Sequence, residues 1–79
     1  MEDLKFKYFI QDLVTLFKEK LEENHMESKS DLPQSKRDFV KGEVFAYYEM
    51  LDLIKSQCIA FDIPLDEFGL EDYNLESFL

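Results

Sequence analysis

The chain has 79 residues and one cysteine, and 18 Asp and Glu against 9 Lys and Arg give it a formal net charge of −9. A chain of this length is expected to form one small domain, and a single cysteine excludes an intrachain disulfide and a cysteine-based zinc site. The fold must therefore be stabilised by dense apolar packing or by a second copy, and the reducing cytoplasm is the expected compartment.

The negative charge is concentrated in the second half of the sequence. Residues 1–41 hold eight Lys and Arg against nine Asp and Glu, whereas residues 42–79 hold Lys55 against nine acids. Direct binding to nucleic acid or to an anionic membrane is disfavoured, because phosphates are bound by concentrated Lys and Arg. A charged partner is expected to be a basic protein, although acids that only keep an aromatic-rich chain in solution would give the same pattern.

Residues 3–26 are predicted to form the first helix. The opening stretch, MEDLKFKYFIQDLV, carries two acids and two lysines before its apolar positions become dense, so neither a signal peptide nor a membrane span is expected. At helical spacing the apolar side chains fall in one arc. They are Phe6, Phe9, Ile10, Leu13, Val14, Leu16, Phe17 and Leu21. The pattern is lost after Leu21, so the last turns are expected to fray.

Glu22 and His25 have the Glu-x-x-His spacing of carboxylate-bridged metal bundles. Such sites need two of these motifs and further inward carboxylates, whereas this chain has one histidine, which its helical angle places among solvated residues. No metal and no other cofactor is expected.

A second helix is predicted over residues 32–62, after a short polar turn. Asp31 as the N-cap, Pro33 in the first turn and Gln34 form a start signal, and Ser35 with Asp38 offers a second possible cap. Apolar residues then recur at steps of four and three, the repeat of a helix that lies along another helix. They are Val40, Val44, Tyr47, Leu51, Ile54, Cys58 and Phe61.

Further apolar side chains flank this stripe on both sides, so one facing helix cannot cover them all. One flank consists of Phe39, Ala46, Met50, Leu53 and Ala60, and the other of Phe45, Tyr48 and Ile59. Gly42 indicates either a close approach of another backbone or a helix position at which the cost of glycine is tolerated. Phe45 and Tyr48 lie at an edge, where aromatic residues often anchor interfaces. The side chain of Glu43 projects into the apolar arc. It either sets the register with a facing helix or reaches solvent past its neighbours.

Residues 64–79 form an acidic, apolar tail. The bond between Ile63 and Pro64 ends the second helix, and Gly69 is expected to cap a short helical turn. Phe68, Tyr73 and Phe78 are among seven large apolar residues of this segment. The tail could dock on a partner, but folding back over its own helices is favoured because these groups are costly to leave in water.

No catalytic residue is expected. Cys58 lies on the apolar stripe without an adjacent base or positive charge, which a nucleophilic cysteine needs. The acid pairs of the tail lack an enclosing apolar pocket, and the two glycines make no phosphate-binding loop.

The sequence therefore predicts an all-α protein: a two-helix antiparallel hairpin with short C-terminal helical turns that dimerises into a four-helix bundle. A monomer with the tail as a third layer is the alternative. The expected function is that of a non-enzymatic interaction module, accessory or regulatory, and the alternative is an acidic decoy that occupies the nucleic-acid site of a basic partner. The candidate interface residues are Gly42, Phe45, Tyr47, Tyr48, Leu51, Phe68, Tyr73 and Phe78.

Overall fold

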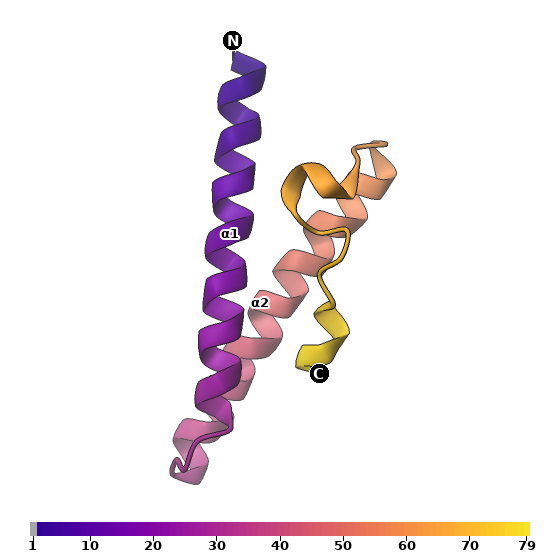
Figure 1. The fold of residues 1–79 in the computed structure, drawn as a ribbon. Helices are drawn as coiled ribbons and strands as arrows, with labels where there is room; N and C mark the ends of the chain where they lie inside the picture. Colours follow the sequence, from indigo (N-terminus) through magenta and orange to yellow (C-terminus); the bar gives the residue numbers. More distant parts are fainter. Residues whose placement is uncertain (1) are drawn as a thin grey trace.

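The computed structural model describes residues 2–79, and the side chains of residues 4–79. Two long helices, α1 (Glu2–Ser28) and α2 (Gln34–Ala60), are followed by two 3-10 turns, η1 (Leu65–Phe68) and η2 (Leu75–Phe78). The helices run in opposite directions and spread apart away from their connecting loop, and the C-terminal segment folds back beside them (Figure 1). We call the end with this loop the loop end and the other the open end. The predicted all-α helical hairpin is confirmed.

The last turns of α1 do not fray as expected. Leu21 is fully buried, and the helix continues to Ser28, whose hydroxyl donates a hydrogen bond to the carbonyl of His25 at 2.6 Å. The His25 ring, expected in solvent, meets the ring of Phe78 edge to face, with centroids 5.0 Å apart. The sequence pattern of α1 did not reveal these contacts because they are made with the tail.

The two ends of α2 also differ from the expected signals. The helix begins at Gln34 with Pro33 in the N-cap position, and no side chain caps it, so Asp31 does not act as the N-cap. At the other end Asp62 has a φ of 57°, while the amide of Ile63 donates to Cys58 and that of Asp62 to Ile59. These two bonds form a Schellman motif, which ends the helix at Ala60 before proline is reached.

The core is built from all three segments of the chain. Val14 and Leu21 of α1 and Val44 and Leu51 of α2 are buried together with Leu70 and Leu75 of the C-terminal segment. Gly69 caps η1 in the left-handed conformation, as predicted. The tail is thus a third layer on its own helices. Within residues 2–79, the helices lack the combination of length and apolar character that crossing a membrane requires.

Polar contacts between the tail and α1 reinforce this packing. The Gln11 amide donates to the carbonyl of Glu67 at 2.8 Å, and the Lys18 ammonium donates to the carbonyl of Gly69. The same ammonium lies over the ring of Tyr73, 4.5 Å from its centroid. The tail therefore lies along one flank of α1, the flank that carries Gln11 and Lys18.

Candidate functional site

Three parallel rows of side chains run along α1. The row that meets the tail is Gln11, Lys18, Glu22 and His25. The core row is Ile10, Val14, Phe17 and Leu21. The third row, on the flank away from the tail by helical spacing, is Phe6, Phe9, Leu13, Leu16, Lys20, Glu23 and Glu27.

The second helix repeats this arrangement. Its core row is Val40, Val44, Tyr47, Leu51, Ile54 and Cys58. Beside it, again away from the tail, runs a row at steps of three and four. That row is Lys36, Phe39, Glu43, Ala46, Met50, Leu53 and Gln57, and it continues into Phe61, the C-cap residue of the helix. We call the third row of α1 and this row of α2 together the uncovered face.

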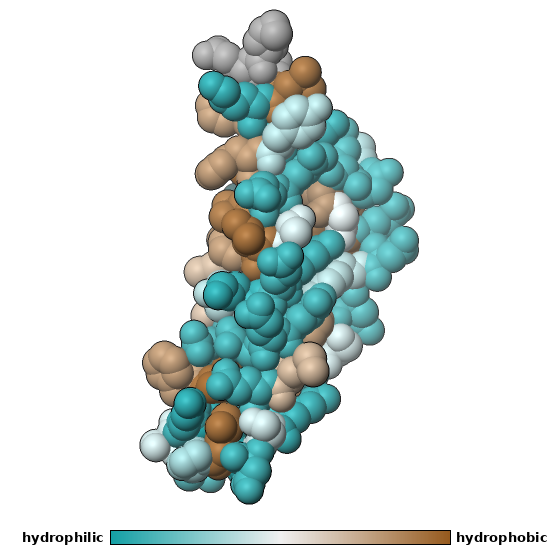
Figure 2. All heavy atoms as spheres, turned by 60° about the vertical axis from the view of Figure 1, so that its left-hand side comes forward, coloured by the Kyte–Doolittle hydropathy of each residue, from teal (hydrophilic) through white to brown (hydrophobic). Residues whose placement is uncertain are grey.

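The uncovered face is the main exposed apolar feature of the described chain. Phe6, Leu53 and Phe61 leave 65%, 63% and 72% of their surface in water. In Figure 2 apolar side chains gather along the left-hand edge, whereas most of the surface turned toward the viewer is hydrophilic. At the open end the face includes a groove of about 350 Å³ between the diverging helices. Its lining is apolar apart from one glutamine and consists of Ile10, Leu53, Ile54, Gln57, Cys58, Phe61, Ile63 and Phe68.

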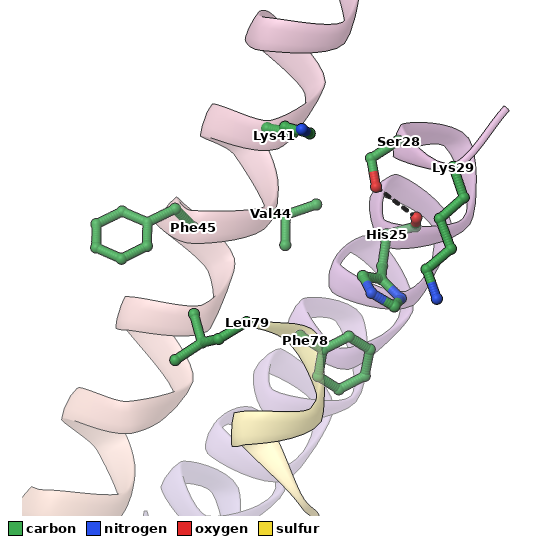
Figure 3. A pocket seen from close by; sticks show the side chains of 8 residues that line it. All are labelled: His25, Ser28, Lys29, Lys41, Val44, Phe45, Phe78 and Leu79. Carbon is green, nitrogen blue, oxygen red and sulfur yellow. Dashed lines mark hydrogen bonds between the residues drawn. The ribbon is translucent and has the colours of Figure 1, made fainter. Parts of the chain in front are cut away.

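A second hollow, of about 480 Å³, lies at the loop end on the side of the tail. Figure 3 shows it between α1, α2 and the last turn, with Phe78 turned toward α1, Leu79 toward α2 and Phe45 pointing away. Its lining contains three basic side chains, His25, Lys29 and Lys41, and no acid. His25 lies in the last turn of α1 and Lys29 directly follows the helix. The helix dipole favours positive charge at this end.

Two titratable groups, Cys58 in the core and Tyr73 in the tail, have raised pKa values. Burial raises the pKa of the Cys58 thiol, and the negative charge of Glu67 raises it further, so the reactive thiolate is disfavoured. Burial also raises the pKa of Tyr73, as does the hydrogen bond of 2.7 Å that its hydroxyl donates to the Glu22 carboxylate. In the part of the chain with described side chains, no three His, Cys, Asp or Glu are grouped to hold a metal ion.

The predicted interface residues fall in several different places. Leu51 is completely buried in the core of its own chain, and the ring of Tyr47 packs on Phe17 in the same core. A Cβ atom at Gly42 would have no neighbour within 4 Å, so no other backbone of this chain comes close.

The aromatic residues of that set lie on the tail or beside it. The rings of Phe45 and Tyr48 stack on each other, 6.2 Å apart. Phe68, Tyr73 and Phe78 are half-buried against the core of their own chain. The eight predicted residues therefore do not form one continuous surface in the single chain.

The residues of the uncovered face were present in the sequence pattern but were not selected as interface residues. Phe6, Phe9 and Leu16 lie in the apolar arc of the first helix, and Met50 and Leu53 in one flank of the second. The widths of these arcs indicated that some apolar surface would stay exposed. Which flank stays exposed depends on the side taken by the tail, and no local spacing encodes that side.

No protein-family model matches the chain, and no match was found among the curated proteins or among the solved structures.

Proposed function

We propose that the chain is a non-enzymatic interaction module that acts as a homodimer, in which two hairpins join through their uncovered faces into a four-helix bundle. The observation that carries the proposal is the second apolar row on each helix. A helix with one neighbour needs one such row, and a helix of a four-helix bundle contacts two neighbours. The tail does not cover this second row, because it packs on the opposite flank of both helices.

The amount of exposed apolar surface supports the same proposal. Phe6, Phe9, Phe39 and Phe61 each expose 58–72% of their surface. At about 150–250 Å² per aromatic side chain, these four leave roughly 400–650 Å² in water. Leu16, Met50 and Leu53 add to this area. A stable dimer buries about 800 Å² on each partner, whereas the largest apolar patch of a typical monomer measures about 300–600 Å².

Light scattering coupled to size exclusion tests the homodimer, with Leu53→Glu as the disrupting variant. The natural chain should have twice the 9.5 kDa mass of one chain. Leu53 is 63% exposed in the single chain, so glutamate there is tolerated in a monomer but would be desolvated in the dimer. The variant should therefore elute at 9.5 kDa with unchanged helical circular dichroism.

Ile59→Glu is the matched control, because Ile59 lies on the other flank of α2 and is 61% exposed. This variant should remain dimeric. A natural chain of 9.5 kDa at micromolar concentrations, or equal effects of the two glutamates, would contradict an interface on the uncovered face.

A further inference from the structure

The uncovered face also contains information on how a second copy would be oriented. A two-fold axis along the hairpin places both loops at the same end and lays α1 of one chain on α2 of the other, at equal heights. A two-fold axis across the hairpin places the loops at opposite ends and lays α1 on α1 and α2 on α2, with the heights reversed. The chemistry along the face distinguishes these two arrangements.

One contact between the helices serves as the reference for heights along the hairpin. The ring centroids of Phe17 and Tyr47 lie 5.9 Å apart, and we take these two residues as the common level. Because the helices are antiparallel with equal rise per residue, Lys20 is level with residue 44 and Glu27 with residue 37. By the same count Leu13 is level with residue 51.

Apolar and charged residues of the face are separated along its length. The open-end half carries Phe6, Phe9 and Leu13 of α1 with Leu53 of α2 and Phe61, the residue that follows α2. The loop-end half carries the charged residues of both rows, which are Lys20, Glu23 and Glu27 of α1 and Lys36 and Glu43 of α2. One exposed phenylalanine, Phe39, lies among them. An arrangement that aligns like ends therefore joins apolar surface to apolar surface.

With the loops at the same end, four of the five charges of the face, all except Glu23, also meet an opposite charge. Lys20 of one chain is level with Glu43 of the second copy, and Glu27 is level with Lys36 of the second copy. The two-fold axis repeats both pairs. In the open-end half Leu13 faces the region of Met50 and Leu53, where apolar side chains meet.

With the loops at opposite ends, the same residues are mismatched. Phe9 lies six residues before the middle of α1 at Thr15, and Lys20 lies five residues after it. The reversal of heights therefore places Phe9 of one chain opposite Lys20 of the other. Glu43 likewise faces the region of Met50. A burial of unpaired charge against apolar side chains is costly. If the chains slid until only the open-end halves overlapped, Phe39 would remain in water and both charge pairs would be lost.

We propose that the second copy docks on the uncovered face with its loop at the same end, so that Lys20 pairs with Glu43 and Glu27 with Lys36 between the chains. This inference rests on the proposed homodimer and specifies its geometry. Each α1 then contacts α2 of its own chain and α2 of the other.

A distance between two spin labels at the loops tests the geometry. Asp31 is exposed in the loop, so the label is attached at Asp31→Cys in a Cys58→Ala background whose dimeric mass has been checked. The proposed geometry gives a distance shorter than about 30 Å, because neighbouring helices of a bundle lie about 8–10 Å apart. Loops at opposite ends give a distance near the 48 Å length of the chain.

The possible outcomes separate the geometry from the dimer itself. A long distance with a dimeric mass would overturn the same-end geometry and leave the homodimer in place. A monomeric mass without dipolar coupling would overturn both proposals. Dilution with unlabelled chain must lower the depth of the dipolar modulation, which shows that the measured distance lies between two chains.

Charge variants give a second, independent measurement. One chain carries Lys20→Glu and Lys36→Glu, and the other carries Glu27→Lys and Glu43→Lys. The changes at Lys36 and Glu27 suit the helix ends where they lie, because acids are favoured near N-termini and bases near C-termini. Native mass spectrometry of the mixture should show the mixed dimer in at least tenfold excess over either homodimer. A statistical mixture of dimers would contradict the proposed charge pairs.

Discussion

Gly42 and Gly69 are the two glycines of the sequence, and they occupy opposite backbone environments. Gly69 has a φ of 70°, and a Cβ atom there would lie 2.9 Å from the Lys18 ammonium nitrogen. Gly42 lies inside α2 with open space around it. The cap at Gly69 was predictable, because a glycine after a short helical segment is a known stop signal.

Alanine at these two positions should change stability in opposite directions. Gly69→Ala should lower the free energy of unfolding by about 1–2 kcal/mol, because a left-handed conformation is costly for an L-residue and the contact with Lys18 is disturbed. Gly42→Ala should raise it by about 0.5–1 kcal/mol, since alanine favours a helix interior over glycine. Urea unfolding measures both. A loss of stability in Gly42→Ala would instead indicate that another chain approaches the backbone there.

Tyr73 connects the tail to α1 in a way that depends on pH. Its pKa is raised first by burial and then by the hydrogen bond and negative charge of Glu22. The folded chain therefore favours the protonated phenol. Its contribution to stability is present below the ordinary tyrosine pKa of about 10 and is lost as the pH rises through the higher pKa of the folded state.

A titration of tyrosinate absorbance should identify Tyr73 as the last of the four tyrosines to ionise. Tyr73→Phe should remove this last step and weaken the alkaline loss of stability, at a cost of at most about 1 kcal/mol at neutral pH for the missing hydrogen bond. Tyr8→Phe is the control, because Tyr8 is 61% exposed. If Tyr8→Phe removed the last step instead, Tyr73 would not be held by Glu22.

At the level of the elements, local sequence spacing predicted the two helices but not the way in which α2 begins and ends. The core row of α2 has the predicted steps of four and three as far as Cys58, because a packed antiparallel helix imposes that repeat. Phe61, predicted as its last member, is instead 72% exposed, because α2 ends at Ala60. Asp31 was expected to cap α2, yet the chain enters the helix at Gln34 without a side-chain cap. The left-handed turn at Asp62 is not a glycine position, so the sequence did not predict this stop signal.

The C-terminal segment places two leucines, Leu70 and Leu75, in the core. Leu70 is 1% exposed, whereas Leu79 is 73% exposed. Leu70→Ala should therefore lower the free energy of unfolding by about 2–5 kcal/mol, because it leaves a cavity in the core. Leu79→Ala should change it by less than about 0.5 kcal/mol. Urea unfolding followed by circular dichroism compares the two, and equal effects would contradict the packing of the tail as a third layer.

At the level of the whole molecule, the hairpin is elongated, with extents of 48 × 21 × 16 Å, and its two broad flanks are treated differently. The tail covers one flank with Leu70 and Leu75. The other flank keeps Phe6, Phe9 and Leu53 in water. A fold of this size buries a smaller fraction of its surface than a larger domain does. The flank without a cover is therefore where a second copy would add most to stability.

The sequence by itself determined the two antiparallel helices, the apolar arcs that contain their core rows and the cap at Gly69, because each depends on residues that are neighbours in the chain or one turn apart. Only the tertiary structure decided that the tail covers the flank of Lys18 and Glu22. That choice depends on contacts between residues about fifty positions apart, such as Tyr73 with Glu22. Helical periodicity gives the width of an apolar arc but not which of its edges a distant segment will cover.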